Sequence, residues 1–130
     1  MKTGRSAGET VLIVDDNELS LKLTRALLMK AGYDVKTACD ADRAMSVIEA
    51  CHPRLILMDL QLPGVDGLQL TKTLKTDPVT QDIKILAVTA YGMKGDAQKA
   101  RVAGCDGFVP KPIDARALPD LVQSHLCETP

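Results

Sequence analysis

The chain has 130 residues, 45% of them hydrophobic, which is the size and composition of one folded domain rather than of a disordered segment. Its 16 basic and 17 acidic residues leave a net charge of −1, so charge gives no reason to expect binding to nucleic acid or to a membrane surface. No apolar run approaches the roughly 20 residues that a membrane span needs, and residues 1–9 lack the apolar core of a signal peptide. We therefore expect a cytoplasmic protein.

The first helix and the strand before it are predicted within residues 10–32. Residues 1–9 are polar and small, and we expect them to form a flexible tail. The apolar run at 11–14 predicts a strand, Asn17 can cap the helix that follows, and Gly32 ends that helix. Four apolar residues of this helix share one stripe, which we expect to face the core: Leu19, Leu23, Ala26 and Leu27.

A second strand and helix are predicted before the most apolar run of the chain. Residues 33–37 alternate with a period of two, which is typical of an edge strand with one wetter face. Asp40 can cap the next helix and Pro53 ends it. The inner face of this helix is expected to consist of Ala44, Val47, Ile48 and Cys51. The continuous apolar run at 55–58 then predicts a strand buried on both faces.

The second half of the chain continues the same alternation. A third helix is expected to turn Leu70 and Leu74 inward. A buried strand at 83–88, a helix at 93–103 and a very short strand at 107–109 follow. Five strand–helix units in strict alternation predict an α/β fold with a parallel sheet covered by helices on both faces.

The last helix contains a proline that leaves its start open. Its apolar residues predict a helix from about Asp114 towards Leu126, but Pro119 would cost about 3 kcal/mol in a helix interior. Either the helix starts late, near Arg116 or Ala117, or it is kinked.

Polar residues of particular kinds stand where the predicted strands end: Asp15, Asp16, Asp59, Thr89 and Lys111. The carboxyl ends of parallel strands meet at one edge of a sheet, where ligands bind in open α/β folds. Carboxylates that converge there repel one another, and a divalent cation relieves the repulsion. An all-oxygen ligand set suits Mg²⁺ better than zinc.

A carboxylate beside a cation, a lysine and a hydroxyl matches phosphoryl transfer to aspartate. Asp59 can attack a phosphoryl group, and catalysis then consists mostly of positioning and charge neutralisation. Lys111, the Thr89 hydroxyl and a backbone N–H after Asp59 would each meet a phosphoryl oxygen. Each of these residues alone has an ordinary structural explanation, such as a helix cap or a solvated lysine. Such explanations do not account for all of them standing at successive strand ends.

The motifs VLIVDDN at 11–17, LMDLQLPG at 57–64, VTA at 88–90 and KP at 111–112 together resemble the receiver domain of bacterial two-component response regulators. The resemblance runs from about residue 10 to residue 126. Within the family, the pattern is most similar to stand-alone regulators of the DivK kind and to receivers of hybrid kinases.

The resemblance implies the fold in more detail than the periodicity does. It implies a doubly wound, flavodoxin-like sandwich whose five parallel strands lie in the order 2-1-3-4-5. It also implies one receiver domain at 10–127, between a flexible N-terminal tail at 1–9 and a short tail at 128–130.

The resemblance implies a role for each residue at the strand ends. Asp59 is the expected phosphoacceptor. The expected direct protein ligands of Mg²⁺ are Asp16, Asp59 and the backbone carbonyl of Gln61, and Asp15 is expected to hold the metal largely through water. Thr89 and Phe108 correspond to the residues that switch conformation in the family, and Lys111 corresponds to the lysine of the site.

The implied function is that of a signalling module rather than an enzyme. A histidine kinase or a histidine phosphotransfer protein would donate the phosphoryl group, and a downstream protein target would read the switched surface. Neither nucleic acid nor a membrane is expected as a direct partner.

Three other functions fit the sequence less well. A phosphohydrolase with an aspartate nucleophile needs an acid–base Asp two residues later, where this chain has Gln61. A flavin or nucleotide site would need a phosphate-binding loop after the first strand, where this chain has Asp-Asp-Asn at 15–17. A degenerate receiver that acts only as a scaffold would not need the complete acidic set.

Overall fold

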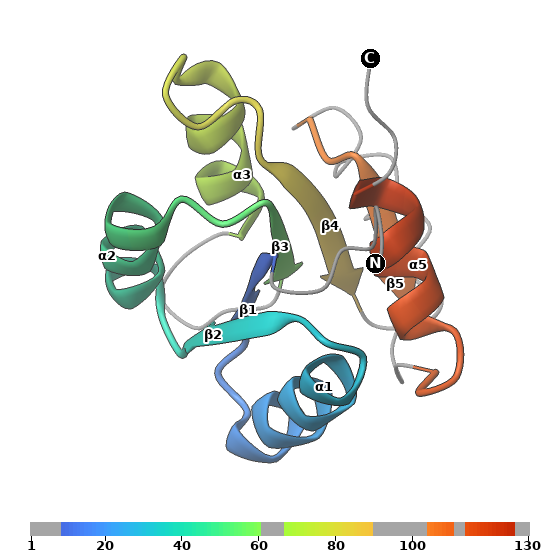
Figure 1. Ribbon diagram of the computed structural model, residues 1–130. Coiled ribbons are helices and arrows are strands. Elements are labelled where there is room, and N and C mark those ends of the chain that lie inside the picture. The colour runs from blue at the N-terminus through green and yellow to red at the C-terminus, as the bar shows by residue number, and fades with distance from the viewer. Residues whose placement is uncertain (1–8, 61–66, 90–103, 111–113, 127–130) are drawn as a thin grey trace.

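The computed structural model describes residues 9–60, 67–89, 104–110 and 114–126 (Figure 1). Along the chain its elements are β1 Thr10–Val14, α1 Glu18–Lys30, β2 Asp34–Ala38, α2 Ala41–Cys51, β3 Leu55–Asp59, α3 Gly67–Thr76, β4 Lys84–Thr89, β5 Gly107–Pro110 and α5 Leu118–Leu126. The helix expected at 93–103, all but the last residue of the N-terminal tail and the whole C-terminal tail lie outside the described residues.

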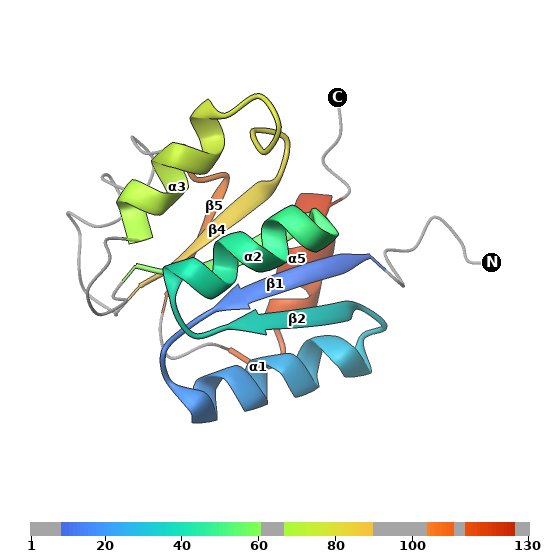
Figure 2. The same cartoon turned by 90° about the vertical axis from the view of Figure 1, so that its left-hand side faces the viewer.

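The five strands form one sheet in the order β2-β1-β3-β4-β5, and every neighbouring pair is parallel. The predicted fold class and strand order are therefore confirmed. The register aligns Val14 of β1 with Met58 of β3, and Asp59 of β3 with Val88 of β4. Because all strands run the same way, their carboxyl ends lie along one edge of the sheet (Figure 2).

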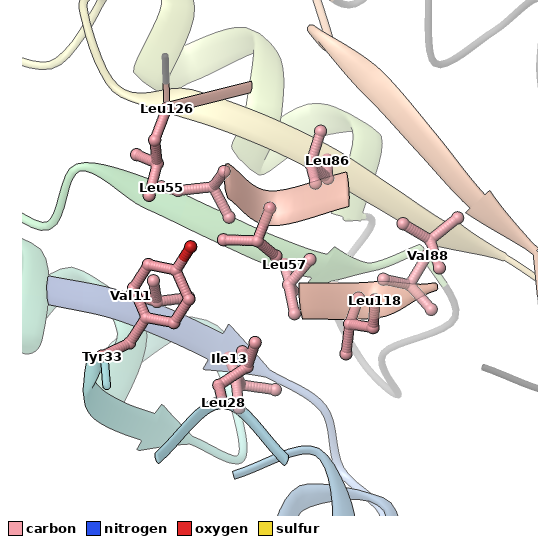
Figure 3. Close-up of a cluster of buried hydrophobic side chains, with 12 residues drawn as sticks. Val11, Ile13, Leu28, Tyr33, Leu55, Leu57, Leu86, Val88, Leu118 and Leu126 are labelled. Carbon is pink, nitrogen blue, oxygen red and sulfur yellow. The ribbon is translucent and has the colours of Figure 1, made fainter. Parts of the chain in front are cut away.

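Alternate residues of the strands face two apolar layers. On one side the strands pack against α1 and α5, with Leu28, Leu118 and Leu126 among the helix residues that fill this layer (Figure 3). On the other side they pack against α2 and α3, where Leu70 and Leu74 point inward as predicted. All five residues of β3 are buried, which confirms the strand predicted to have no solvent-exposed face.

The predicted inner face of α1 is wrong for three of its four residues, and only Leu27 packs against the core. Leu19 and Leu23 are 66% and 59% exposed, and Ala26 is exposed too. The helix instead buries Thr24 and Leu28, with Leu21 and Leu27 half-buried against the core. This helix carries two apolar stripes, and apolar periodicity alone does not say which of them packs on the sheet.

The N-terminal ends of α1 and α2 are capped as predicted. The side chain of Asn17 accepts a hydrogen bond from the backbone N–H of Ser20 at 3.0 Å, and Asp40 accepts from Arg43 at 2.8 Å. α2 ends at Cys51, and His52, which caps it with a left-handed backbone (φ 46°), is followed by the expected Pro53. Cys51 is exposed, so its predicted place on the inner face is wrong.

α5 starts late, so the kinked alternative is wrong. The helix begins at Leu118, one residue after Ala117, and Pro119 is its second residue. A proline in the first turn has no intrahelical N–H bond to lose, which removes the cost expected in a helix interior. The residues before it form a turn in which the backbone N–H of Ala117 donates to the carbonyl of Asp114.

The three cysteines in the described part of the chain carry free thiols. Cys39 is exposed like Cys51. Burial raises the pKa of the Cys105 thiol to about 11, so this thiol is protonated at neutral pH.

A polar clamp holds the opposite edge of the sheet, at the amino ends of β4 and β5. The ammonium group of Lys75 donates to a carboxylate oxygen of Asp106 at 2.9 Å and to the carbonyl oxygens of Gln81 and Ile83 at 3.2 and 3.0 Å. The same oxygen of Asp106 accepts from the backbone N–H of Ile85 at 2.9 Å. The clamp thereby joins α3, β4 and the segment before β5.

We expect Asp106→Ala to lower the free energy of unfolding by about 1–3 kcal/mol. Hydrogen bonds to charged groups contribute about 1.5–3 kcal/mol each, and partial exposure of this pair reduces the figure. Urea unfolding followed by circular dichroism suits the measurement, because the chain has no tryptophan.

Asp82→Ala is the matched control. Its carboxylate pairs with His52 at 3.3 Å, but both side chains are exposed, so we expect a change within about 0.5 kcal/mol. Equal losses of unfolding free energy in the two variants would show that the clamp stabilises the fold no more than an exposed ion pair does.

Candidate functional site

The site is built where β1 and β3 end side by side. Asp15 directly follows β1, and Asp59 is the last residue of β3. The backbone N–H of Asp15 donates to the carbonyl of Ala38, which extends the pairing with β2 by one residue. The backbone N–H of Leu60 donates to the carbonyl of Val88 at 3.0 Å, which extends the pairing with β4 in the same way. Both carboxylates therefore project from backbone that the sheet holds fixed.

Three carboxylates converge at this edge, as the sequence predicts. Asp15, Asp16 and Asp59 each offer a carboxylate oxygen, and these atoms all lie within 4.8 Å of one another. Asp15 and Asp59 are only 4% and 2% exposed, whereas Asp16 is exposed. The group is therefore anchored in the fold and reachable from solvent on the side of Asp16.

The chemistry of the donor set fits a hard divalent cation. At an effective dielectric constant of about 20, two unit charges roughly 5 Å apart repel by about 3 kcal/mol, so three clustered carboxylates favour a bound cation. Every donor is a carboxylate oxygen, and this set suits Mg²⁺ better than zinc or copper. The exposed side at Asp16 leaves room for the waters that Mg²⁺ usually keeps.

Asn17 has a second role that the sequence analysis missed. Its backbone N–H donates to the Oδ1 atom of Asp15 at 2.9 Å, while its side chain caps α1. The start of the helix is thereby tied to one carboxylate of the site. The Asp-x-Asn spacing is the signal that was available, because aspartate side chains often accept from the backbone two residues later.

The remaining predicted site residues are placed in part. Thr89 is the last residue of β4 and pairs with Pro110, so its backbone lies at the same edge of the sheet as Asp59. Phe108 lies on β5 and is 37% exposed, so it is not a core residue. Gln61 and Lys111 lie outside the described residues.

No helix in the described part of the chain is long and apolar enough to cross a membrane.

Comparison with known proteins gives one consistent result. Residues 11–123 match the model of the response regulator receiver domain family. The chain is 42% identical over 118 residues to the polar-differentiation response regulator DivK of Brucella ovis, which covers 91% of this chain and 96% of the relative.

Solved structures of the same family are similar across nearly the whole chain. A putative response regulator from Chloroflexus aurantiacus superposes with a TM-score of 0.89 at 30% identity, over 93% of this chain and 99% of that one. The receiver domain of a sensor histidine kinase from Pseudomonas aeruginosa superposes with a TM-score of 0.83 at 29% identity, over 92% and 98% of the two chains. That structure has a magnesium ion coordinated in its active-site cleft.

We expect Asp16→Asn to weaken Mg²⁺ binding at least about 10-fold, because it removes one of three clustered charges. Asp16 is exposed, so the variant should fold normally. Titration calorimetry with MgCl₂ measures the affinity. Asp42→Asn, an exposed acid in the first turn of α2, is the control and should bind like the unchanged protein. Equal affinity in all three proteins would refute the cation site.

Proposed function

Because the chain belongs to the response regulator receiver domain family, we propose that it receives a phosphoryl group on Asp59 from a histidine kinase or a histidine phosphotransfer protein. Membership in the family makes the chain a signalling protein rather than a classical enzyme. The observation that carries the proposal is the convergence of Asp15 and Asp16 on Asp59, the carboxylate that ends the fully buried strand β3.

The proposed reaction transfers a phosphoryl group from a histidine nitrogen of the donor to a carboxylate oxygen of Asp59. A carboxylate oxygen of Asp59 attacks the phosphorus of a phosphohistidine, the P–N bond breaks, and its electron pair stays on the imidazole nitrogen. The product is an acyl phosphate on Asp59. Because the carboxylate projects from backbone bonded to β4, the protein contributes mainly by holding the nucleophile in one place.

Charge neutralisation is the second contribution. Asp15, Asp16, Asp59 and, as a proposed fourth ligand, the backbone carbonyl of Gln61 would hold Mg²⁺. When bound, Mg²⁺ would neutralise charge on the phosphoryl oxygens. Lys111, which directly follows β5, is proposed to meet another phosphoryl oxygen as a point charge.

The proposed output is a shift between two conformations. The Thr89 hydroxyl gains a hydrogen bond to the phosphoryl group by moving towards Asp59, and Phe108 then changes rotamer on β5. The exposure of Phe108 supports this, because a ring that lies partly in solvent still has surface to bury when it turns inward. A downstream protein target reads the altered surface of β5 and α5, and a few kcal/mol of preference is enough for the switch.

The exposed stripe of α1 supports a protein as the phosphodonor. α1 begins at the edge of the sheet where β1 and β2 end (Figure 2), and Leu19 follows Asp16 by three residues. A protein that brings a phosphohistidine to Asp59 must therefore cover the first turns of this helix. Leu19 and Leu23 offer it apolar surface of the kind that stable contacts bury.

We expect acetyl phosphate to label Asp59 and no other residue, in a reaction that needs Mg²⁺. Mass spectrometry after hydroxylamine treatment locates the acyl phosphate. Asp59→Asn keeps the size of this buried side chain and should abolish labelling, whereas the exposed control Asp82→Asn should leave it intact. Full labelling of the Asp59→Asn protein would rule out Asp59 as the acceptor.

We expect Leu23→Ser to slow phosphotransfer from a phosphorylated histidine kinase about fivefold or more, since central apolar contacts typically contribute over 1 kcal/mol to binding. Labelling by acetyl phosphate should not change, because this small donor does not touch α1. Val79→Ser is the control, an exposed apolar residue between α3 and β4. The docking surface would be wrong if the two variants slowed transfer equally.

A further inference from the structure

Gly67, the first residue of α3, lies directly against the backbone of the phosphoacceptor. A Cβ atom added to this glycine would be 2.7 Å from the carbonyl oxygen of Asp59 and 2.9 Å from the Cα atom of Leu60. Cβ atoms in proteins essentially never approach a non-bonded heavy atom of a distant residue more closely than 3.0 Å. Both neighbours are backbone atoms, so neither can rotate away as the end of a side chain would.

Glycine is a poor choice for a helix on local grounds, because it is among the weakest helix formers. Its presence at the start of α3 is explained by the close approach, since any other residue would push the helix and β3 apart. The first turn of α3 is also held in place by contacts of its own residues. The buried hydroxyl of Thr71 donates to the carbonyl of Gly67 at 2.9 Å, and Leu70 packs in the core on the α2 and α3 side of the sheet.

The peptide between Asp59 and Leu60 is therefore held from two directions. On one side its N–H, carried by Leu60, donates to the carbonyl of Val88 in β4 at 3.0 Å. On the other side, Gly67 of α3 lies so near its carbonyl oxygen that no side chain fits between them. A shift of this peptide would carry the Asp59 side chain away from the carboxylates of Asp15 and Asp16, whose oxygens lie within 4.8 Å.

We propose that Gly67 is a positioning residue of the acidic site: its missing side chain lets α3 press on the Asp59–Leu60 peptide and fix the Asp59 carboxylate beside Asp15 and Asp16. This inference rests on the proposed function for its link to Mg²⁺. The contact itself exists without the metal.

Gly67→Ala is the direct test. We expect it to weaken Mg²⁺ binding roughly 10-fold or more, as changes to groups that orient metal ligands typically do. In the metal-free Gly67→Ala protein, we expect the amide signal of Leu60 to shift in NMR spectra and its hydrogen exchange to accelerate. The added methyl group would displace the peptide and weaken the hydrogen bond from Leu60 to Val88. Neither readout depends on phosphorylation.

Gly107→Ala is the matched control. An added Cβ there would overlap just as closely, at 2.6 Å from both Nε2 of His125 and Cδ2 of Leu86, but at the amino end of β5. The atoms met there are ends of side chains that can shift, so this variant should lose less thermal stability than Gly67→Ala and should keep the Mg²⁺ affinity and the exchange rate of Leu60. Equal effects of the two variants on Mg²⁺ affinity, or an unchanged Leu60 amide in Gly67→Ala, would overturn the positioning role.

The outcomes separate this inference from the proposed function. If the unchanged protein binds no Mg²⁺, the proposed function fails, while the Leu60 amide in the metal-free proteins still decides about Gly67. If Gly67→Ala does not fold, Leu70→Ala replaces it, because it loosens the same turn of α3 and leaves the glycine in place. The control is then Leu74→Ala, near the other end of α3. Weaker Mg²⁺ binding by Leu70→Ala than by Leu74→Ala would support the positioning role, and equal binding by the two variants would overturn it.

Discussion

Parallel pairing between β1 and β3 brings two buried carboxylates to the same point, because each strand delivers an aspartate at its carboxyl end. The register that aligns Val14 with Met58 leaves Asp15 and Asp59 as the next neighbours, and Asp16 completes the group. The side chains of β3 alternate between the two apolar layers, so a slip of one residue would exchange them and disrupt the packing of both layers. The sheet thus offsets the repulsion that it creates, and a cation reduces it further.

Two helix starts complete the site that the strand ends begin. α1 is tied to Asp15 through the backbone N–H of Asn17, and α3 lies against Asp59 through Gly67. The two helices lie on opposite faces of the sheet (Figure 1), so the carboxylates are held from both sides. Among the three described carboxylates Asp16 is the exposed one, and the exposed stripe of α1 begins three residues after it, at Leu19. The exposed carboxylate and the proposed docking surface for the phosphodonor therefore lie on the same side of the site.

The sequence predicts the strands and the acidic site well, because two short apolar runs each end in aspartate and the carboxyl ends of parallel strands meet at one edge of the sheet. It predicts helix faces less well. In α1 the stripe of Leu19 and Leu23 is as apolar as the one that buries Leu28, and only the sheet decides between them. The role of Gly67 was beyond reach, because a close approach between residues 59 and 67 exists only after folding. Thr89 and Lys111 keep their roles as predictions that follow from the family resemblance.

The central claim is that the sheet presents Asp59 as a phosphoacceptor within a cation site. Its most direct test is a crystal structure of the protein soaked with Mg²⁺ and beryllofluoride, a mimic of the phosphoryl group. The account predicts beryllium bound to a carboxylate oxygen of Asp59, with Mg²⁺ beside it among the oxygens of Asp15 and Asp16. Beryllofluoride on another residue, or Mg²⁺ bound away from these three carboxylates, would contradict it.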